Sequence, residues 1–186
     1  MLLSIYRRIG LVLGLSLLLV NAAYSYTLLN SVIWPANGHM YQVYGGTTKW
    51  ADAMAFASTV SAPGFYNGYL ATVHSDAENA LITSLLTLPA WLGGYQIEGQ
   101  TDPAAGWRWV TGEPWTYTNW QPGQPNDNQG IDERYLVIYS TGFWHDFPDI
   151  TRPRFVVELN PVPDPASIAG LGIGLAGLLL RRRKRS

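Results

Sequence analysis

The 186-residue chain carries an apolar segment at each end, and these two segments confine any water-exposed fold to the residues between them. Near the start, two arginines precede the 12-residue apolar run Ile9–Val20, and Ala23 and Ser25 place small residues at positions −3 and −1 of a cut after Ser25. This arrangement is typical of a signal peptide, which we place at residues 1–25. A retained transmembrane helix is the alternative, although the run is shorter than the roughly 20 residues that span a bilayer.

The C-terminal residues 161–186 combine a proline-bounded break, an apolar run and a basic cluster. Pro163, Asp164 and Pro165 precede 13 apolar and Gly residues, Ile168–Leu180, and five consecutive cations follow. Such a cluster stays on the cytoplasmic side of a bilayer. The tail resembles the PEP-CTERM sorting signal of Gram-negative bacteria, with Asp164 where the family has Glu. The resemblance implies export, transient anchoring in the inner membrane, and delivery to the cell surface or the exopolysaccharide; an ordinary tail anchor is the alternative.

The segment between the two ends, residues 26–163, is acidic. It holds five of the 12 Lys and Arg residues of the chain and 12 of its 13 Asp and Glu residues, which gives it a net charge of −7. Nucleic-acid binding depends on cations that neutralise phosphates, so this balance argues against nucleic acid as a partner and favours cations as ligands.

The chain has no cysteine, so an exported domain of this size must be held together without disulfides. All eight tryptophans lie between Trp34 and Trp144. Indole rings bury large areas, and we expect them to replace part of the stabilisation that a disulfide would give. The three histidines, His39, His74 and His145, are dispersed, which argues against a His-rich zinc site.

Apolar periodicity predicts two helices followed by several short strands, which is an α+β pattern. The first helix is expected over Thr48–Val60 with Thr48 as its cap, and the second begins at Ser75, whose capping box uses Glu78, and is ended by Pro89. The expected buried face of the second helix consists of Ala77, Ala80, Leu81, Leu85 and Leu88. Strands are expected at His39–Tyr44, Tyr69–Val73, Arg134–Tyr139, Phe143–Phe147 and Phe155–Leu159.

Short motifs follow one another in a fixed order across Trp34–Leu159. In order they are Leu70–Asn79, Trp91–Gly94, Trp109–Pro114, Tyr117–Trp120, Gln124–Asp127, Gly142–Asp146 and Phe155–Glu158. Their order and spacing resemble those of C-type lectin-like domains, and we place such a domain at residues 26–160. The resemblance implies an α+β fold in which two helices flank short antiparallel sheets and a long loop bears the ligand site. The usual disulfides of the family are absent; Tyr135 sits near one expected Cys position, where an apolar contact would substitute.

The long loop and its surroundings are rich in side-chain oxygens. Within 26 positions they include those of Gln124, Asn126, Asp127, Asp132, Glu133, Asp146 and Asp149. Mixed amide and carboxylate oxygens are the ligands that Ca²⁺ takes, six to eight at about 2.3–2.6 Å. Solvated turn residues are the alternative, because Asn, Asp, Gly and Pro dominate turns.

The resemblance assigns roles to particular residues of this loop. Residues matching those that hold one Ca²⁺ in calcium-dependent members are Gln124, Asn126, Glu133 and Asp146, and two vicinal sugar hydroxyls complete the coordination there. Pro125 matches a cis-proline of the family. The Gln-Pro-Asn triplet is similar to that of galactose-type members.

Two residues depart from the family pattern. His145 stands where the family has an Asn that contacts both ion and sugar; an imidazole donates to a hydroxyl but is a poor ligand for a hard cation. Arg134 stands where an Asp of an accessory Ca²⁺ site is expected, so that site is not predicted. Trp115, Tyr117, Trp120 and Trp144 are expected in the core rather than on a sugar-binding platform.

Three functions follow, in decreasing order of support. The first is an exported, non-enzymatic domain that binds a carbohydrate or an extracellular matrix polysaccharide with the help of Ca²⁺, through Gln124, Asn126, Glu133, His145 and Asp146. The second is a calcium-independent scaffold of the same fold that binds a protein or matrix partner. The third is an enzyme with a carboxylate pair or a His–carboxylate pair as acid and base; no nucleophile motif or complete metal triad supports it.

Overall fold

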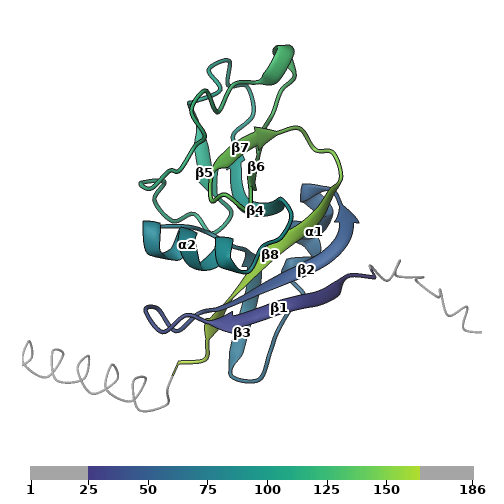
Figure 1. Ribbon diagram of the computed structural model, residues 1–186, viewed down its shortest axis with the longest axis vertical. Coiled ribbons are helices and arrows are strands. Elements are labelled where there is room, and N and C mark those ends of the chain that lie inside the picture. The colour runs from purple at the N-terminus through teal and green to yellow at the C-terminus, as the bar shows by residue number, and fades with distance from the viewer. Residues whose placement is uncertain (1–24, 164–186) are drawn as a thin grey trace, which may run out of the picture.

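The structure is a computed structural model that describes residues 25–163. The signal peptide placed at residues 1–25 therefore lies, apart from Ser25, outside the described residues, as does most of the sorting tail. Two α-helices and eight strands form one domain of the α+β class, as predicted (Figure 1). The strands are β1 (Thr27–Ile33), β2 (Met40–Thr48), β3 (Phe65–Leu70), β4 (Ala90–Gln96), β5 (Trp107–Trp109), β6 (Tyr135–Ile138), β7 (Trp144–Phe147) and β8 (Arg152–Pro161).

All eight strands belong to one sheet rather than to separate short sheets. Its order is β1-β2-β8-β4-β6-β7, with β3 paired to β8 and β5 paired to β4. Every pairing is antiparallel except that of β4 with β8, which is parallel and centred on Trp91 and Phe155. Figure 1 shows helix α2 (Asp76–Ser84) on one side of the strands, helix α1 (Trp50–Ala57) on the other, and the loop between β5 and β6 at the end remote from β1.

The predicted strands are confirmed in position, with one exception. The predicted strand Tyr69–Val73 overlaps β3 only at its end, because the chain after Leu70 leaves the ladder although Ala71 N–H still donates to Val156. Strands β1, β4 and β5 were not predicted. Nearly all residues of β1 are exposed and its sequence has no alternation. Within residues 25–163 no helix combines the length and the apolar character needed to cross a bilayer.

The cap of α1 comes from a distant part of the chain, so the prediction that Thr48 caps this helix is wrong. The N-cap residue is Lys49, which makes no side-chain cap bond. Instead the carboxylate of Asp149 accepts the N–H of Trp50 at 3.0 Å. The hydroxyl of Thr48 donates to the Lys49 carbonyl.

Helix α2 begins as predicted but buries a different face. Ser75 is the N-cap, and its hydroxyl accepts the N–H of Glu78 at 3.2 Å. The carboxylate of Glu78 accepts the N–H of His74 instead of returning to Ser75. The buried residues of the helix are Glu78, Asn79 and Ile82, not the predicted set of Ala and Leu residues. Hydrogen-bonded polar side chains occupy the core-facing positions, so apolar periodicity pointed to the wrong face.

Aromatic side chains stabilise the region that carries the long loop. Trp107, Trp109, Trp115, Trp120 and Trp144 pack against one another, with ring centroids 4.4 Å apart for Trp109 and Trp115 and 4.8 Å apart for Trp107 and Trp120. On the opposite side of the sheet Tyr135 stacks on Trp50 at 4.6 Å. That contact lies where an apolar contact was expected in place of a disulfide.

A close approach of two backbones explains one glycine of the Trp-Leu-Gly-Gly motif. The N–H of Gly93 donates to the carbonyl of Ala71 at 2.8 Å. A Cβ atom at Gly93 would lie 2.3 Å from the carbonyl oxygen of Leu70. No side chain fits there, so the position requires glycine for β4 to pass the end of β3.

Candidate functional site

The segment after the tryptophan cluster turns sharply at a cis peptide bond. The bond between Gln124 and Pro125 is cis, as expected from the Gln-Pro-Asn triplet. Asp127 follows with a φ of +47°, and the 3-10 helix η1 (Asn128–Gly130) begins directly after it. These turns bring the loop back to strand β7.

Asp146 on β7 anchors the returning loop. Its carboxylate oxygen Oδ2 accepts the backbone N–H groups of Asn126 at 2.8 Å and Asp127 at 2.9 Å. The residue is 1% exposed, and its other oxygen, Oδ1, is buried with no hydrogen-bond partner among the described residues. One oxygen of Asp146 therefore fixes the loop, and the other remains unsatisfied.

Glu133 joins the same group from the far end of the loop. Its N–H donates to the carboxylate of Asp127 at 2.9 Å, and its Oε2 accepts the N–H of Asn128 at 3.1 Å. The side-chain oxygen of Gln124 is buried and, in the described part of the chain, has no hydrogen-bond partner. Asn126 is exposed, so its amide is available at the surface.

Burial and mutual repulsion act on the carboxylates of the loop. Desolvation raises the pKa of Glu133, and the neighbouring Asp146 and Asp127 raise it further. Desolvation also raises the pKa of Asp146, with a contribution from Asp127 in the same direction. Arg152 opposes the shift at Glu133, but this arginine lies over the ring of Phe147, 3.5 Å from its centroid. A bound cation would relieve this repulsion.

The acidic side chains alone do not make a metal site. Within residues 25–163, no three His, Cys, Asp or Glu side chains are close enough together to hold an ion. The loop does contain two buried oxygens without partners, one an amide and one a carboxylate. This donor chemistry fits a hard cation, which Gln124, Asn126, Glu133 and Asp146 would hold.

A profile of the lectin C-type domain matches residues 38–156 of the chain. The chain belongs to the C-type lectin domain family. A second profile, that of the PEP-CTERM protein-sorting motif, matches residues 161–184. That motif indicates an exported protein that undergoes sorting, in agreement with the prediction for the tail.

Individual relatives of this C-type lectin domain come from archaea and animals. The chain is 30% identical over 147 residues to halomucin of Haloquadratum walsbyi, a match that covers 71% of this chain but 2% of that protein. It is 29% identical over 128 residues to a C-type lectin mannose-binding isoform of Notechis scutatus scutatus. This second match covers 67% of this chain and 78% of the relative. The chain therefore spans only a small part of the first of these relatives and most of the second.

Solved structures share the fold of this C-type lectin domain. The C-type lectin CEL-I from Cucumaria echinata superposes with a TM-score of 0.58 at 24% identity, over 70% of this chain and 97% of that one. A calcium-independent type II antifreeze protein superposes with a TM-score of 0.57 at 22% identity, over 73% and 98%. Because a calcium-independent protein shares this fold, the fold alone does not establish that this chain binds calcium.

His145 of this C-type lectin domain is directed to neighbours other than the loop oxygens. Its Nε2 lies 2.7 Å from the side-chain oxygen of Gln121, and because that oxygen only accepts, Nε2 carries the proton of the bond. The ring packs on Tyr139 with centroids 4.4 Å apart. Burial lowers the pKa of His145, which favours the neutral imidazole.

The tryptophans that the sequence placed in the core of the C-type lectin domain are found there. Trp144 is fully buried, and its indole N–H donates to the amide oxygen of Asn79 at 2.8 Å. Trp120, Trp115 and Tyr117 pack partly buried against the same cluster. Sequence reasoning missed Asn79, whose amide nitrogen also donates to the Gly142 carbonyl and so links α2 to β7.

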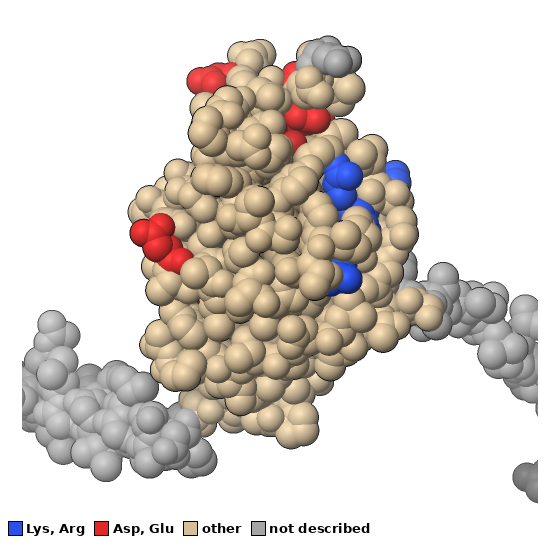
Figure 2. All heavy atoms as spheres, viewed as in Figure 1, with Lys and Arg blue, Asp and Glu red and all other residues tan. Residues whose placement is uncertain are grey.

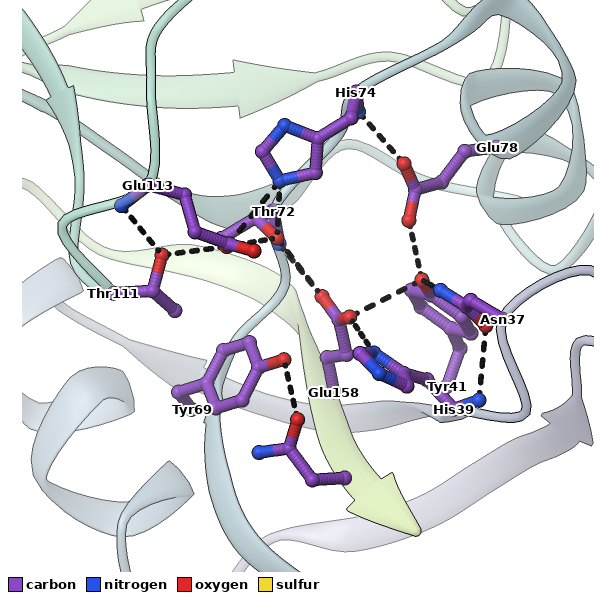
Figure 3. A network of polar contacts seen from close by, with 11 residues as sticks. Asn37, His39, Tyr41, Tyr69, Thr72, His74, Glu78, Thr111, Glu113 and Glu158 are labelled. Carbon is purple, nitrogen blue, oxygen red and sulfur yellow. Dashed lines mark hydrogen bonds and ion pairs between the residues drawn. The ribbon is translucent and has the colours of Figure 1, made fainter. Parts of the chain in front are cut away.

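A second group of polar side chains lies between β2, α2 and β8 (Figure 3). Glu158 is 2% exposed; its Oε1 accepts from His39 at 2.6 Å and from Tyr41, and its Oε2 accepts the N–H and hydroxyl of Thr72. The Tyr41 hydroxyl also lies within hydrogen-bonding distance of Glu78, and its single proton is shared between the two carboxylates. The sequence signal for this group was Glu158, an acidic residue within the otherwise apolar predicted strand Phe155–Leu159.

Charges within this group shift one another's ionisation. The hydrogen bond to Glu158 raises the pKa of His39, against the effect of burial. Desolvation raises the pKa of Glu78. A cavity of about 340 Å³ lies beside the group, lined by Trp34, Asn37, His39, His74, Glu113 and others. Protein donors already satisfy the carboxylates of Glu78 and Glu158, so the group stabilises the packing of α2 against β2 and β8.

Proposed function

We propose that this domain is an exported, non-enzymatic carbohydrate-binding module that holds one Ca²⁺ at the long loop. The ligands are the side chains of Gln124, Asn126, Glu133 and Asp146, and the hydroxyls of a bound sugar complete the coordination. The supporting observation is the pair of buried oxygens without hydrogen-bond partners, Gln124 Oε1 and Asp146 Oδ1. A buried acceptor left without a partner costs about 1–3 kcal/mol, and a cation offers one partner to both oxygens.

The charges of these ligands match the ion. Two carboxylates, Glu133 and Asp146, balance its two positive charges, and two amides, from Gln124 and Asn126, add neutral oxygen ligands. Such a bound ion stabilises the loop and presents free coordination positions at the surface, where Asn126 is exposed. The Gln-Pro-Asn triplet favours galactose-type sugars by the family resemblance.

The variant Asn126→Ala tests this function, because it removes a ligand without touching the backbone N–H that holds the loop to Asp146. Calorimetric titration with Ca²⁺, and then with galactose and mannose at saturating Ca²⁺, should show binding to the unchanged chain and none to this variant. Asn128→Ala, in the same loop, is the matched control and should bind as the unchanged chain does. Ca²⁺ binding that survives Asn126→Ala would remove this residue from the site.

A calcium-independent scaffold that binds a protein or matrix partner is the second candidate. The supporting observation is the pairing of His145 with Gln121, which leaves the loop one oxygen ligand short of the family pattern. Binding to polysaccharide or protein partners that persists unchanged in a calcium chelator would favour this function over the first.

The C-terminal tail bears on where the exported protein is located. We infer that it retains the exported chain transiently at the inner membrane and directs it to the cell surface or the extracellular matrix, on the basis of the match to the sorting motif over residues 161–184. Replacing the five cations of residues 181–185 with Ser should impair retention and tail removal. The measurement is the mass and location of the mature chain; an unchanged mass and location would contradict this role.

A further inference from the structure

A pocket on the side of the molecule that carries α1 takes no part in the calcium site. It has a volume of about 310 Å³ and is lined by Trp50, Met54, Tyr95, Val110, Arg134 and Tyr135. Small-molecule pockets in proteins begin at about this size, and they combine aromatic walls with a few polar groups. The pocket is formed by α1, β4, the residue after β5, and the start of β6.

The walls of the pocket are aromatic and held in place. Trp50 stacks on Tyr135 with ring centroids 4.6 Å apart and lies 6.0 Å from the ring of Tyr95. The indole N–H of Trp50 donates to the Leu92 carbonyl at 2.8 Å, which fixes the ring. Met54, one turn further along α1, is 40% exposed. An apolar side chain at the mouth of an aromatic pocket offers contact to a ring-shaped ligand.

Arg134 supplies the one charged group of the pocket. Its Nε is buried and has no hydrogen-bond partner in residues 25–163. Its only ion pair there joins Nη1 to Asp132 at 3.7 Å, and Asp132 is 65% exposed. A guanidinium whose single ion partner is distant and exposed is suited to a carboxylate, which accepts hydrogen bonds from its N–H groups.

The surroundings of the pocket reinforce this preference. Figure 2 shows Lys and Arg side chains gathered on the side of the molecule over α1 and β8, whereas Asp and Glu lie at the loop end and on the opposite side. Lys49 is the N-cap of α1, and Arg152 and Arg154 belong to β8. In a domain with a net charge of −7, this side is where an anion meets the least repulsion.

We propose that this pocket binds a carboxylated sugar, a hexuronic acid residue of an acidic polysaccharide. The apolar face of the pyranose ring lies against the rings of Tyr95 and Tyr135, and the carboxylate accepts hydrogen bonds from Arg134. The choice of a sugar rests on the proposed carbohydrate-binding function, but the pocket requires no calcium. Together with the loop site it gives the domain two contacts with one polymer.

The test uses the full-length chain in a non-ionic detergent with a calcium chelator present. Saturation-transfer NMR titrations compare methyl β-D-glucuronide with methyl β-D-glucoside, which has the same ring without the carboxylate, and with acetate, which has the carboxylate without the ring. We expect the glucuronide to bind about tenfold more tightly than either. Equal binding of the two glycosides, or of acetate and the glucuronide, would overturn the proposal.

Two variants locate the binding. Arg134→Gln should weaken glucuronide binding about tenfold, and Met54→Glu, which places an anion at the exposed mouth, should weaken it as well. Arg154→Gln, an arginine of β8 that does not line the pocket, is the control and should have a much smaller effect. Unchanged affinity in both pocket variants would overturn the proposal. A galactose titration with Ca²⁺ on the same sample tests the loop site separately. If the chain binds the glucuronide but no galactose, the proposal for the pocket stands and the proposed function of the loop fails.

Discussion

Asp146 and Asn126, 20 residues apart in the chain, are joined by a hydrogen bond of 2.8 Å from the Asn126 backbone N–H to Asp146 Oδ2. The same oxygen accepts from Asp127, so one carboxylate on a buried strand holds the turn of the long loop. The other oxygen of Asp146 stays free of protein donors among the described residues. The residue thus has a structural role and a proposed metal-binding role on separate atoms.

These two roles predict different effects for two substitutions of Asp146. Asp146→Ala leaves two N–H groups without their acceptor and should lower the free energy of unfolding by about 1–3 kcal/mol. Asp146→Asn keeps one carbonyl oxygen for the loop and should cost less, yet both variants should lose Ca²⁺ binding. Urea unfolding and calorimetry measure the two effects. The control, Asp132→Ala at an exposed position, should change stability by less than about 0.5 kcal/mol; equal losses in all three would contradict the assignment.

Asp149 provides a second prediction, on the stability of α1. Its carboxylate accepts the first N–H of that helix from 99 residues away. Asp149→Ala should therefore lower the free energy of unfolding by about 1 kcal/mol, the usual effect of losing an N-cap. Asp149→Asn keeps an acceptor and should restore most of the loss. Thermal unfolding followed by circular dichroism compares the variants, and identical effects of Ala and Asn would exclude the capping role.

The pairing of His39 with Glu158 predicts a dependence of stability on pH. The pKa of His39 is raised above 6.5 in the folded state, mainly by its hydrogen bond to Glu158. The folded chain therefore binds this proton more tightly than the unfolded chain, so the contribution is fully present below pH 6.5 and is lost as the pH rises through the folded pKa.

His39→Gln should remove that loss of stability above pH 6.5. The measurement is the free energy of unfolding of both chains at intervals from pH 6 to pH 9. Above pH 6.5 His145 does not interfere, because burial lowers its pKa and its contribution changes below that pH. Parallel curves for the two chains would show that the protonation of His39 makes no contribution to the pH dependence of stability.

Much of the fold was predictable because its determinants are local or follow a recognisable order. Ser75 and Glu78 are three residues apart, and the predicted cap between them is present. The cap of α1 was not predictable, since nothing near Thr48 in the sequence points to Asp149. The buried face of α2 was mispredicted for the same reason, because Asn79 is buried only by virtue of its partner Trp144, 65 residues later.

The candidate site divides in the same way. The resemblance to C-type lectin-like domains proposed Gln124, Asn126, Glu133 and Asp146 as ligands, and the structure adds the contacts that position the last two. The sequence did not indicate that Asp127 would link Glu133 to the Asp146 anchor through a left-handed backbone conformation. It also gave no sign of the pocket beside Arg134, which depends on α1 and β6 lying side by side.

The last prediction concerns His145, where the two candidate functions diverge. The imidazole is held by Gln121 and Tyr139 and supplies no oxygen to the loop. His145→Asn should add an oxygen ligand and tighten Ca²⁺ binding by about tenfold, since affinity follows the number of oxygen ligands. It should also present an amide N–H to a sugar hydroxyl.

Gln121→Ala is the matched control for His145→Asn. It removes the hydrogen-bond partner of the imidazole but adds no ligand, so Ca²⁺ affinity should not rise. Calorimetric titration with Ca²⁺ and galactose distinguishes three outcomes. A gain for both ligands in His145→Asn supports the carbohydrate-binding function, and a gain for Ca²⁺ alone keeps the metal site without the sugar. No gain in a folded His145→Asn variant means that the loop does not coordinate calcium, because the one ligand missing from the family pattern has then been restored without effect. The calcium-independent scaffold then becomes the function of this domain.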